Sequence, residues 1–147
     1  MRKEIIILLE TAVDHLSGEE LGNAITLLND MPETLDAIYI PAIGKKNRPT
    51  GLMQILCRPE SEKTVARAVF RHTHTLGLRR QEIERYILER RPATAEIAGE
   101  AVPAKIHLVE GREYIRPEAD AVSKLADRLG IGAPGLRFLN PDHKNGN

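Results

Sequence analysis

The order of strands and helices predicted for the first 91 residues limits more than any other feature how this chain can fold. Short runs of Ile, Leu and Val predict buried strands, and a longer run of mixed apolar and charged residues predicts a partly exposed one. The four predicted strands are 5–9, 37–43, 52–56 and 79–89. Helices are predicted after the first and the third strand. This is the order of a ferredoxin-like split β-α-β-β-α-β unit, so we predict an α+β fold.

The two predicted helices have recognisable ends. Ser17 and Glu20 form a capping-box pattern, in which each side chain bonds the backbone amide of the other residue. Pro59 suits the first turn of the second helix, and Gly77 suits its end. We expect residues 10–16, between the first strand and the first helix, to lie outside the sheet.

The rest of the chain predicts a smaller unit, a β-meander followed by a helix. Its elements are a hairpin of residues 94–97 and 101–109, a strand near Tyr114 and Ile115, and a helix opening at Pro117. Gly99 and Glu100 form the turn pattern of the hairpin. We therefore expect a ferredoxin-like domain, a small β-hairpin plus helix subdomain and a polar tail, at residues 1–91, 92–139 and 140–147.

The composition excludes several classes of protein. The chain has 21 basic and 21 acidic residues, so it lacks the overall positive charge of many nucleic-acid-binding proteins. Aromatic residues make up 3% of the chain, which argues against a protein that stacks bases. The single cysteine, Cys57, permits no internal disulfide and predicts a buried structural thiol. No run approaches the roughly 20 apolar residues of a membrane span. We expect a cytoplasmic protein that binds neither membranes nor nucleic acid.

Positive charge is nevertheless concentrated in one part of the chain. Nine cations lie between Gly44 and Arg80, against only Glu60 and Glu62: Lys45, Lys46, Arg48, Arg58, Lys63, Arg67, Arg71, Arg79 and Arg80. Lys45, Lys46, Asn47 and Arg48 fall in one connection between strands. Lys supplies a point charge and Arg a planar fork for phosphate oxygens, so an anionic ligand explains the cluster. A solvated polar turn explains it equally well.

A second polar group follows the second helix. Two hydroxyls, a glycine and an arginine could together cradle a phosphate, and they belong to Thr73, Thr75, Gly77 and Arg79. The alternative is a glycine helix stop with arginines that complement the helix dipole. We predict that this group and the lysine-rich connection converge on a single anion.

Few residues are candidates to hold a metal ion. Asp14 and Glu118 could position a divalent cation beside a triphosphate, although each is also an ordinary acid near a helix start. His72 and His74 lie two residues apart, a spacing that suits a strand and not a helix. We give little weight to a histidine-based nickel or zinc site.

Four segments, in this order, resemble the C-terminal domain of the LarC family of nickel-pincer cofactor assembly proteins. Residues 10–22, ETAVDHLSGEELG, resemble that family's E-T-N-I-D-D-M-(S/T)-G-E-E-L-G, and residues 41–49, PAIGKKNRP, resemble P-I-x-M-K-K-N-R-P. Residues 55–60 and 73–79 are similar to V-L-C-x-P and T-x-T-L-G-V-R. Lys105 and the pair of Pro117 and Glu118 are similar to a later lysine and a P-E-Y-(D/E)-D-C segment.

The resemblance implies a function that the residues alone do not. LarC proteins use CTP with Mn or Mg to cytidylylate pyridinium-3,5-bisthiocarboxylate mononucleotide and then insert nickel, and their C-terminal domain binds CTP and oligomerises. Carried over, this implies a homo-oligomeric cyclometallase subunit with a nucleotide and phosphate site. Its residues would be Lys45, Lys46, Asn47, Arg48, Thr73, Thr75, Gly77, Arg79 and Lys105, with Asp14 and Glu118 as metal ligands.

Departures from the family pattern keep other functions open. Ala12 and His15 replace an Asn and an Asp, and the family's His-rich N-terminal domain has no counterpart in this sequence. The chain could therefore act with a separate N-terminal nickel-handling protein, or be a divergent nucleotide-binding or regulatory subunit without catalysis. An RNA-binding ferredoxin-like domain is a third hypothesis, which the scarcity of aromatic residues disfavours.

Overall fold

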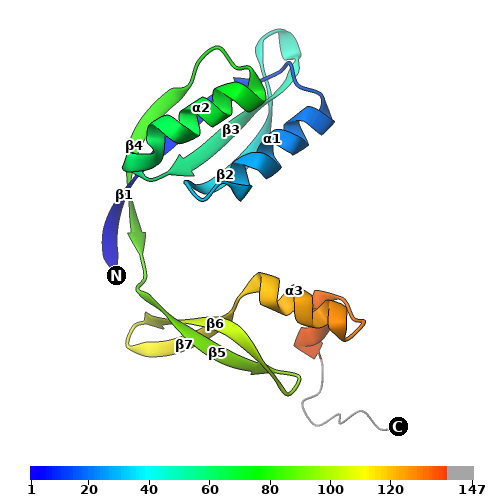
Figure 1. Ribbon diagram of the computed structural model, residues 1–147. Helices are drawn as coiled ribbons and strands as arrows, with labels where there is room; N and C mark the ends of the chain where they lie inside the picture. Colours follow the sequence, from blue (N-terminus) through cyan, green and yellow to red (C-terminus); the bar gives the residue numbers. More distant parts are fainter. Residues whose placement is uncertain (139–147) are drawn as a thin grey trace. The chain divides into compact units, whose positions relative to one another are not determined.

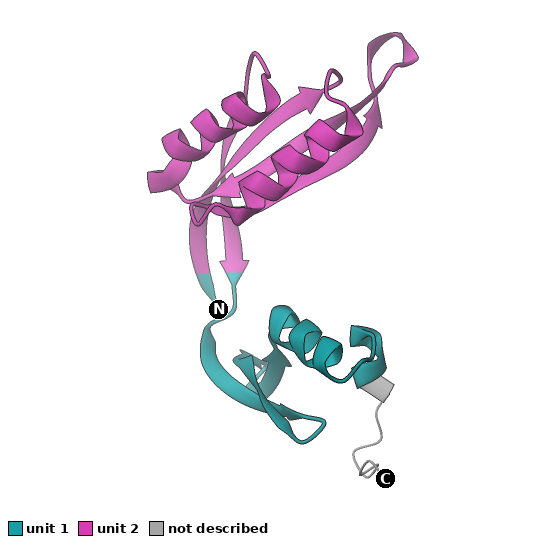
Figure 2. Ribbon diagram, turned by 45° about the vertical axis from the view of Figure 1, so that its right-hand side comes forward, with its two compact units in different colours: residues 1–2, 87–147 teal, residues 3–86 magenta. Residues whose placement is uncertain are grey.

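The computed structural model describes residues 1–138, in two compact units (Figures 1 and 2). One unit is Lys3–Tyr86. The other comprises Met1–Arg2 and Ile87–Asn147, of which residues 139–147 are not described. The polar tail predicted at 140–147 lies outside the described residues.

The first unit has the predicted order of elements. These are β1 (Arg2–Val13), α1 (Gly18–Asp30), β2 (Thr34–Ile43), β3 (Pro49–Cys57), α2 (Glu62–Thr73) and β4 (Arg79–Ile87). Short 3-10 turns, Lys45–Asn47 and Pro59–Ser61, precede β3 and α2. The sheet has the strand order β2-β3-β1-β4, which a split β-α-β-β-α-β connection produces. The predicted α+β fold is confirmed.

All neighbouring strands of this sheet are antiparallel. Met53 of β3 lies opposite Thr11 of β1 and Tyr39 of β2. The ion pairs that Arg85 makes with Glu4 and Arg79 makes with Glu10 show that β1 and β4 also run in opposite directions. Both helices cover the same face of the sheet (Figure 1). The core between them consists of Ile7, Leu9, Val13, Ala24, Leu28, Ala37, Met53, Ile55, Cys57, Val65 and Val69.

The expectation that residues 10–16 lie outside the sheet is wrong for the first four of them. β1 continues to Val13, and the alternation of buried side chains passes from Leu9 through Thr11 to Val13. Thr11 is polar but only 3% exposed, so it occupies a core position that a reading of apolar residues alone does not detect. Asp14 is consequently the first residue after the strand.

The predicted start of α1 is confirmed, whereas the prediction that Gly77 ends the second helix is wrong, because α2 ends at Thr73 and His74 takes the left-handed capping conformation. The Glu20 amide donates to the Ser17 hydroxyl, and the Ser17 amide donates to the Glu20 carboxylate at 2.8 Å. The Cys57 thiol ends β3 and is fully buried, as expected for a structural cysteine, and burial raises its pKa. Among residues 1–138, no helix is long and apolar enough to cross a membrane.

The second unit is a three-stranded meander with one helix packed on it. Its elements are β5 (Arg90–Ile97), β6 (Glu100–Val109), β7 (Arg112–Pro117), α3 (Ala119–Arg128) and a 3-10 segment, Ala133–Phe138. The hairpin turn lies one residue before the predicted place, at Ala98 and Gly99, because both have positive φ angles. Pro117 ends β7 and does not open the helix, since it still lies opposite Ala104 in the sheet. A small core joins sheet and helix through Val102, Leu125, Ala126 and Leu136.

Candidate functional site

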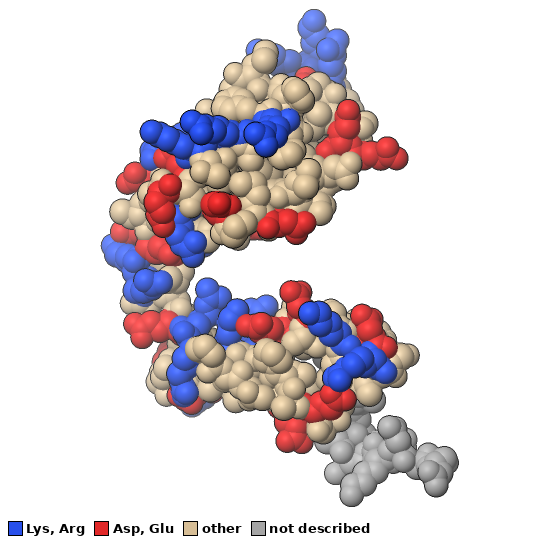
Figure 3. All heavy atoms as spheres, viewed as in Figure 1, with Lys and Arg blue, Asp and Glu red and all other residues tan. Residues whose placement is uncertain are grey.

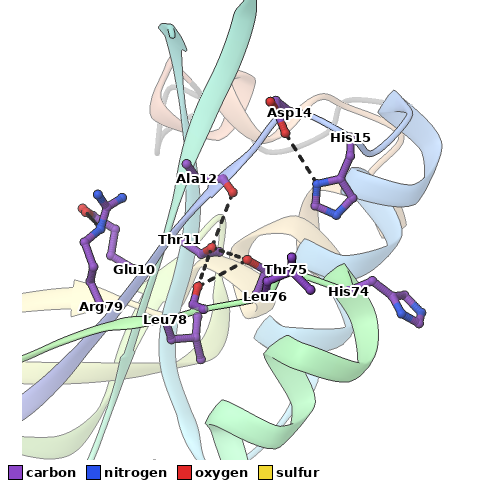
Figure 4. A pocket seen from close by; sticks show the side chains of 11 residues that line it. Glu10, Thr11, Ala12, Asp14, His15, His74, Thr75, Leu76, Leu78 and Arg79 are labelled. Carbon is purple, nitrogen blue, oxygen red and sulfur yellow. Dashed lines mark hydrogen bonds and ion pairs between the residues drawn. The ribbon is translucent and has the colours of Figure 1, made fainter. Parts of the chain in front are cut away.

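A pocket of about 730 Å³ lies where β1 ends beside the connection from α2 to β4. Its lining combines backbone and side chains from these two segments (Figure 4). The residues are Glu10, Thr11, Ala12, Asp14, His15, His74, Thr75, Leu76, Gly77, Leu78 and Arg79. Three predicted phosphate-binding residues, Thr75, Gly77 and Arg79, therefore lie in one pocket with the predicted metal ligand Asp14.

Hydroxyl groups hold the wall of this pocket in place. The Thr11 and Thr75 hydroxyls are 2.5 Å apart, and the Thr11 hydroxyl also lies 3.0 Å from the Gly77 carbonyl. Thr73 is fully buried, and its hydroxyl donates to the Val69 carbonyl while accepting from the Thr75 amide. Thr73 thus fixes the end of α2 and does not face the pocket, whereas Thr75 does.

Arg79 brings a positive charge that is already neutralised. Its Nε lies 3.0 Å from the Glu10 carboxylate, which also accepts a hydrogen bond from Gln54 at 2.8 Å. Figure 4 shows Glu10 and Arg79 together, apart from Thr11 and Thr75. The Arg79 side chain is 59% exposed, so water screens this pair and an anionic ligand could compete for the guanidinium.

Asp14 and His15 form the polar mouth of the pocket. His15 Nε2 lies 2.7 Å from the Thr73 carbonyl oxygen, and because a carbonyl can only accept, this nitrogen carries the proton. His15 Nδ1 faces the Asp14 carboxylate at 3.7 Å. The imidazole is thus held by the end of α2, while the Asp14 carboxylate remains mostly exposed.

No complete metal site is present in the described part of the chain. Residues 1–138 contain no group of three or more His, Cys, Asp or Glu side chains that could hold an ion. Asp14 and Glu118, the two predicted ligands, belong to different units. A single carboxylate suits Mg²⁺ or Mn²⁺ only where nucleotide phosphates supply further ligands, which is how Mg²⁺ is commonly bound.

The lysine-rich segment forms the tight connection between β2 and β3, as predicted. The Gly44 amide donates to the Arg48 carbonyl at 2.8 Å and closes the loop. Lys46 and Asn47 have φ angles of 59° and 56°, in the left-handed region that is costly for residues other than glycine. Two successive residues with positive φ are what a tight hairpin turn requires, and Ala98 and Glu110 adopt the same conformation in the hairpins of the second unit. The turn therefore accounts for the backbone conformation but not for the choice of charged side chains.

This β2–β3 loop lies at the same end of β1 as the pocket. The Thr50 hydroxyl, beside the loop, donates to the carbonyl of Val13, two residues beyond Thr11. Nevertheless, none of the four predicted ligands in this loop lines the pocket; these are Lys45, Lys46, Asn47 and Arg48. The three cations among them make no ion pair within residues 1–138, so their charges are available to a ligand.

The second unit has a pocket of its own, of about 720 Å³. Lys105 and Glu118, assigned above by resemblance, lie in it and form an ion pair at 3.0 Å. Three further residues with basic side chains also line it: Arg90, His107 and Arg116.

The strand register places these basic residues directly opposite one another. Lys105 lies opposite Arg116, and His107 lies opposite Arg90, all on one face of the meander. Like charges directly opposite one another destabilise a sheet, so this pocket is also a candidate anion site. The sequence prediction missed Arg90, His107 and Arg116, although the two-residue spacing of Lys105 and His107 already places them on one face.

Comparison with known proteins identifies the family of this chain. The family model described as nickel insertion protein matches residues 1–135. A curated relative from Archaeoglobus fulgidus is 33% identical over 130 residues, which cover 86% of this chain and 33% of the relative. The pyridinium-3,5-bisthiocarboxylic acid mononucleotide nickel insertion protein of Alkaliphilus metalliredigens is 30% identical over 124 residues, 84% of this chain and 29% of that protein. The chain thus spans about a third of the length of these relatives.

A solved structure shares the fold. It is LarC2, the C-terminal domain of a cyclometallase involved in the synthesis of the NPN cofactor of lactate racemase, in its apo form. The TM-score is 0.81 with 23% sequence identity, and the alignment covers 92% of this chain and 93% of LarC2. Because the family model matches nearly the whole described chain, this protein belongs to the nickel insertion protein family.

Proposed function

We propose that this chain is the CTP-binding part of a nickel-insertion system that makes a nickel-pincer cofactor. The relative from Alkaliphilus metalliredigens is named for inserting nickel into pyridinium-3,5-bisthiocarboxylic acid mononucleotide, and we propose the same mononucleotide as substrate and nickel as the inserted metal. The observation that carries the proposal is the tight β2–β3 loop, which holds three cations without ion pairs at the pocket end of β1. A triphosphate is a ligand that would use all three charges.

Each residue of the site has a distinct role in this proposal. Lys45, Lys46 and Arg48 bind the phosphates, and the charge on the leaving pyrophosphate is stabilised by the same cations. The Thr75 hydroxyl and the backbone at Gly77 supply neutral hydrogen bonds, and Asn47 contacts the nucleoside. The Arg79 guanidinium leaves its ion pair with Glu10 and binds a phosphate instead. Lys105 would bind an anion in the separate pocket of the second unit.

The divalent ion would be shared between protein and nucleotide. Asp14, which is 63% exposed, would hold Mg²⁺ or Mn²⁺ together with phosphate oxygens. By resemblance, Glu118 is a candidate to hold such an ion in the pocket of its own unit. When bound, such an ion withdraws charge from the α-phosphorus and the leaving group. The bond from the α-phosphorus to the bridging oxygen breaks as the mononucleotide attacks, so pyrophosphate leaves and a cytidylyl adduct forms.

Calorimetry with the four nucleoside triphosphates, each with and without Mn²⁺, tests the proposal. CTP should bind best, and Lys46→Ala should weaken its binding by about 1.5–3 kcal/mol, the usual loss for a charged hydrogen bond. Lys124→Ala is the matched control, because Lys124 is exposed on α3 and has no ion pair in the described chain. Absence of CTP binding at millimolar ligand would end the proposal.

A second candidate is a nucleotide-binding or regulatory subunit without catalysis. The LarC pattern has an aspartate at the position of His15. In this chain the His15 imidazole is engaged in a hydrogen bond to the Thr73 carbonyl, and this observation favours the second candidate. The two candidates differ in their products. Chromatography of a reaction with CTP, mononucleotide, nickel and a separately supplied N-terminal nickel-handling protein should detect pyrophosphate and CMP if the chain is catalytic. Binding without either product favours the regulatory subunit.

We also propose that the chain assembles into a homo-oligomer, as the resemblance implies. Light scattering coupled to size-exclusion chromatography should give a mass that is a multiple of the 16.4 kDa chain. A mass of one chain, with and without CTP, contradicts this part of the proposal.

A further inference from the structure

Helix α2 presents an outward row of three cations. Lys63, Arg67 and Arg71 are all exposed and lie four residues apart. Residues at this spacing share one face of a helix, and at 1.5 Å per residue the row is about 12 Å long. Figure 3 shows a continuous line of Lys and Arg side chains over this helix.

Folding alone gives no reason for this row. Like charges four residues apart destabilise a helix, and Lys63 lies in the first turn, where the helix dipole also opposes a positive charge. None of the three side chains makes an ion pair within residues 1–138, although Arg80 beside them pairs with Glu62 at 3.0 Å. Arg71 alone, in the last turn, is favoured by the helix dipole. Helix stability therefore gives no reason for the row as a whole.

An exposed aromatic ring lies within the row. Phe70 is 42% exposed and stands three residues after Arg67 and one before Arg71, on the same side of α2. Aromatic residues are rare in this chain, and an exposed ring flanked by arginines is typical of the central contact in a protein interface. The partner should therefore offer both carboxylates and an apolar surface.

We propose that α2 is a docking surface for an acidic helix of another protein. Carboxylates four residues apart on such a helix have the same spacing as the three cations, and an apolar side chain between them would contact Phe70. A duplex nucleic acid or an anionic membrane fits less well, because its broad negative surface would also meet Glu60, Glu62 and Glu82 near the row. A second copy does not fit, since no helix among residues 1–138 carries acidic residues four apart.

Fluorescence anisotropy with a labelled synthetic peptide tests the proposal on the intact chain. The probe is a helical peptide with Glu at every fourth position and Leu between them. The triple variant Lys63→Gln, Arg67→Gln, Arg71→Gln should bind it about tenfold more weakly, the sum expected for three exposed ion pairs. Gln is a good helix former, so α2 should stay folded, which circular dichroism checks.

A matched control removes the same charge elsewhere. Arg2, Arg58 and Arg112 are exposed and without ion pairs in the described chain, so their triple replacement by Gln should leave peptide affinity within about twofold. Phe70→Ala should weaken binding even at high salt, where the ionic contribution is screened.

Three results would overturn the proposal. One is equal loss of peptide affinity in the two triple variants, which would indicate a general charge effect. Another is a lack of peptide binding by the unmodified protein at low salt. The third is tighter binding of duplex DNA or phosphatidylserine vesicles than of the peptide, abolished by the α2 triple variant alone.

Discussion

Helices α1 and α3, one in each unit, begin in different ways. At α1, the Ser17 hydroxyl and the Glu20 carboxylate both bond backbone amides, so two polar side chains are used to start the helix. At α3, Glu118 occupies the capping position without making a capping bond, and its carboxylate pairs with Lys105. The comparison teaches that a glutamate at a helix start serves the fold in the first unit, whereas in the second unit it lines a pocket.

The two pockets show the same difference. In the first unit, Thr11 and Thr75 bond each other, and Arg79 is neutralised by Glu10. In the second, Lys105 faces Arg116 across the sheet, and Glu118 pairs with Lys105 but not with Arg116. Hydrogen bonds therefore stabilise the lining of the first pocket, whereas the lining of the second carries positive charges that repel one another. Added salt should change the stability of the second pocket more than that of the first.

The largest expected effect follows from breaking the hydroxyl network of the first pocket. Thr11→Val keeps the shape of the side chain but removes partners from Thr75 and the Gly77 carbonyl, in a position that is 3% exposed. The free energy of unfolding should fall by about 1–3 kcal/mol, the usual net contribution of the two lost hydrogen bonds, while Thr75 keeps its own bond to the Gly77 carbonyl. Urea denaturation measures it.

Thr64→Val is the matched control for Thr11→Val. Thr64 is exposed on α2, and no hydrogen bond of its hydroxyl is found in the described chain, so its replacement should change stability by less than about 0.5 kcal/mol. Equal effects of the two substitutions would show that the network contributes nothing.

The second largest effect on the free energy of unfolding is expected from substitutions at the two helix starts. Ser17→Ala should lower the free energy of unfolding by about 1 kcal/mol, because the α1 cap is lost. Glu118→Ala removes only a half-exposed ion pair, so it should cost no more than about 0.5 kcal/mol. Urea denaturation of the two variants measures both losses. A loss at Glu118 as large as at Ser17 contradicts the view that this carboxylate is available for a ligand.

The sequence predicted the order of elements because each strand and helix has local causes. The Ser17–Glu20 box and the apolar runs needed no knowledge of tertiary contacts. The extent of β1 was missed because Thr11, a polar residue, occupies a core position, where its shorter hydrogen bonds are with the distant Thr75 and Gly77. Long-range hydrogen bonds of this kind cannot be read from a local pattern.

The candidate site was predictable in part, for a similar reason. The β2–β3 loop was found because four polar residues in sequence need no register to be recognised. The pairing of Arg79 with Glu10, and that of Lys105 with Glu118, depend on how strands align. Arg116 was missed because its place opposite Lys105 is fixed by the β6–β7 register, which the sequence alone did not supply.

A smaller effect should follow from relieving the charge repulsion in the second unit. Arg116→Thr removes one of two cations that lie directly opposite, so it should raise the free energy of unfolding by about 0.2–1 kcal/mol. The gain should shrink as salt is added. Arg112→Thr is the control, since Arg112 is on the same strand opposite Val109. Equal gains in both variants would mean that strand propensity and not repulsion is responsible.

The smallest expected effect is a change in how the stability of the fold depends on pH, caused by the α1 cap. The Ser17 amide, and less strongly the Ser17 hydroxyl, lower the pKa of Glu20 in the folded protein. A lowered pKa stabilises the fold above the unfolded value of roughly 4.3, and this contribution disappears as pH falls through the folded value. Glu20→Gln should therefore flatten the acid side of the stability curve, as measured by urea denaturation across that range.

NMR titration of the Glu20 carboxyl then separates the two hydrogen bonds. In Ser17→Ala the hydroxyl is gone but the backbone amide of residue 17 still donates, so the Glu20 pKa should rise only part of the way to its ordinary value. A complete return would mean that the hydroxyl, and not the amide, holds the charge. In that case the Glu20 carboxylate is held no more firmly by the backbone than the Glu118 carboxylate is, and the two helix starts do not differ in this respect.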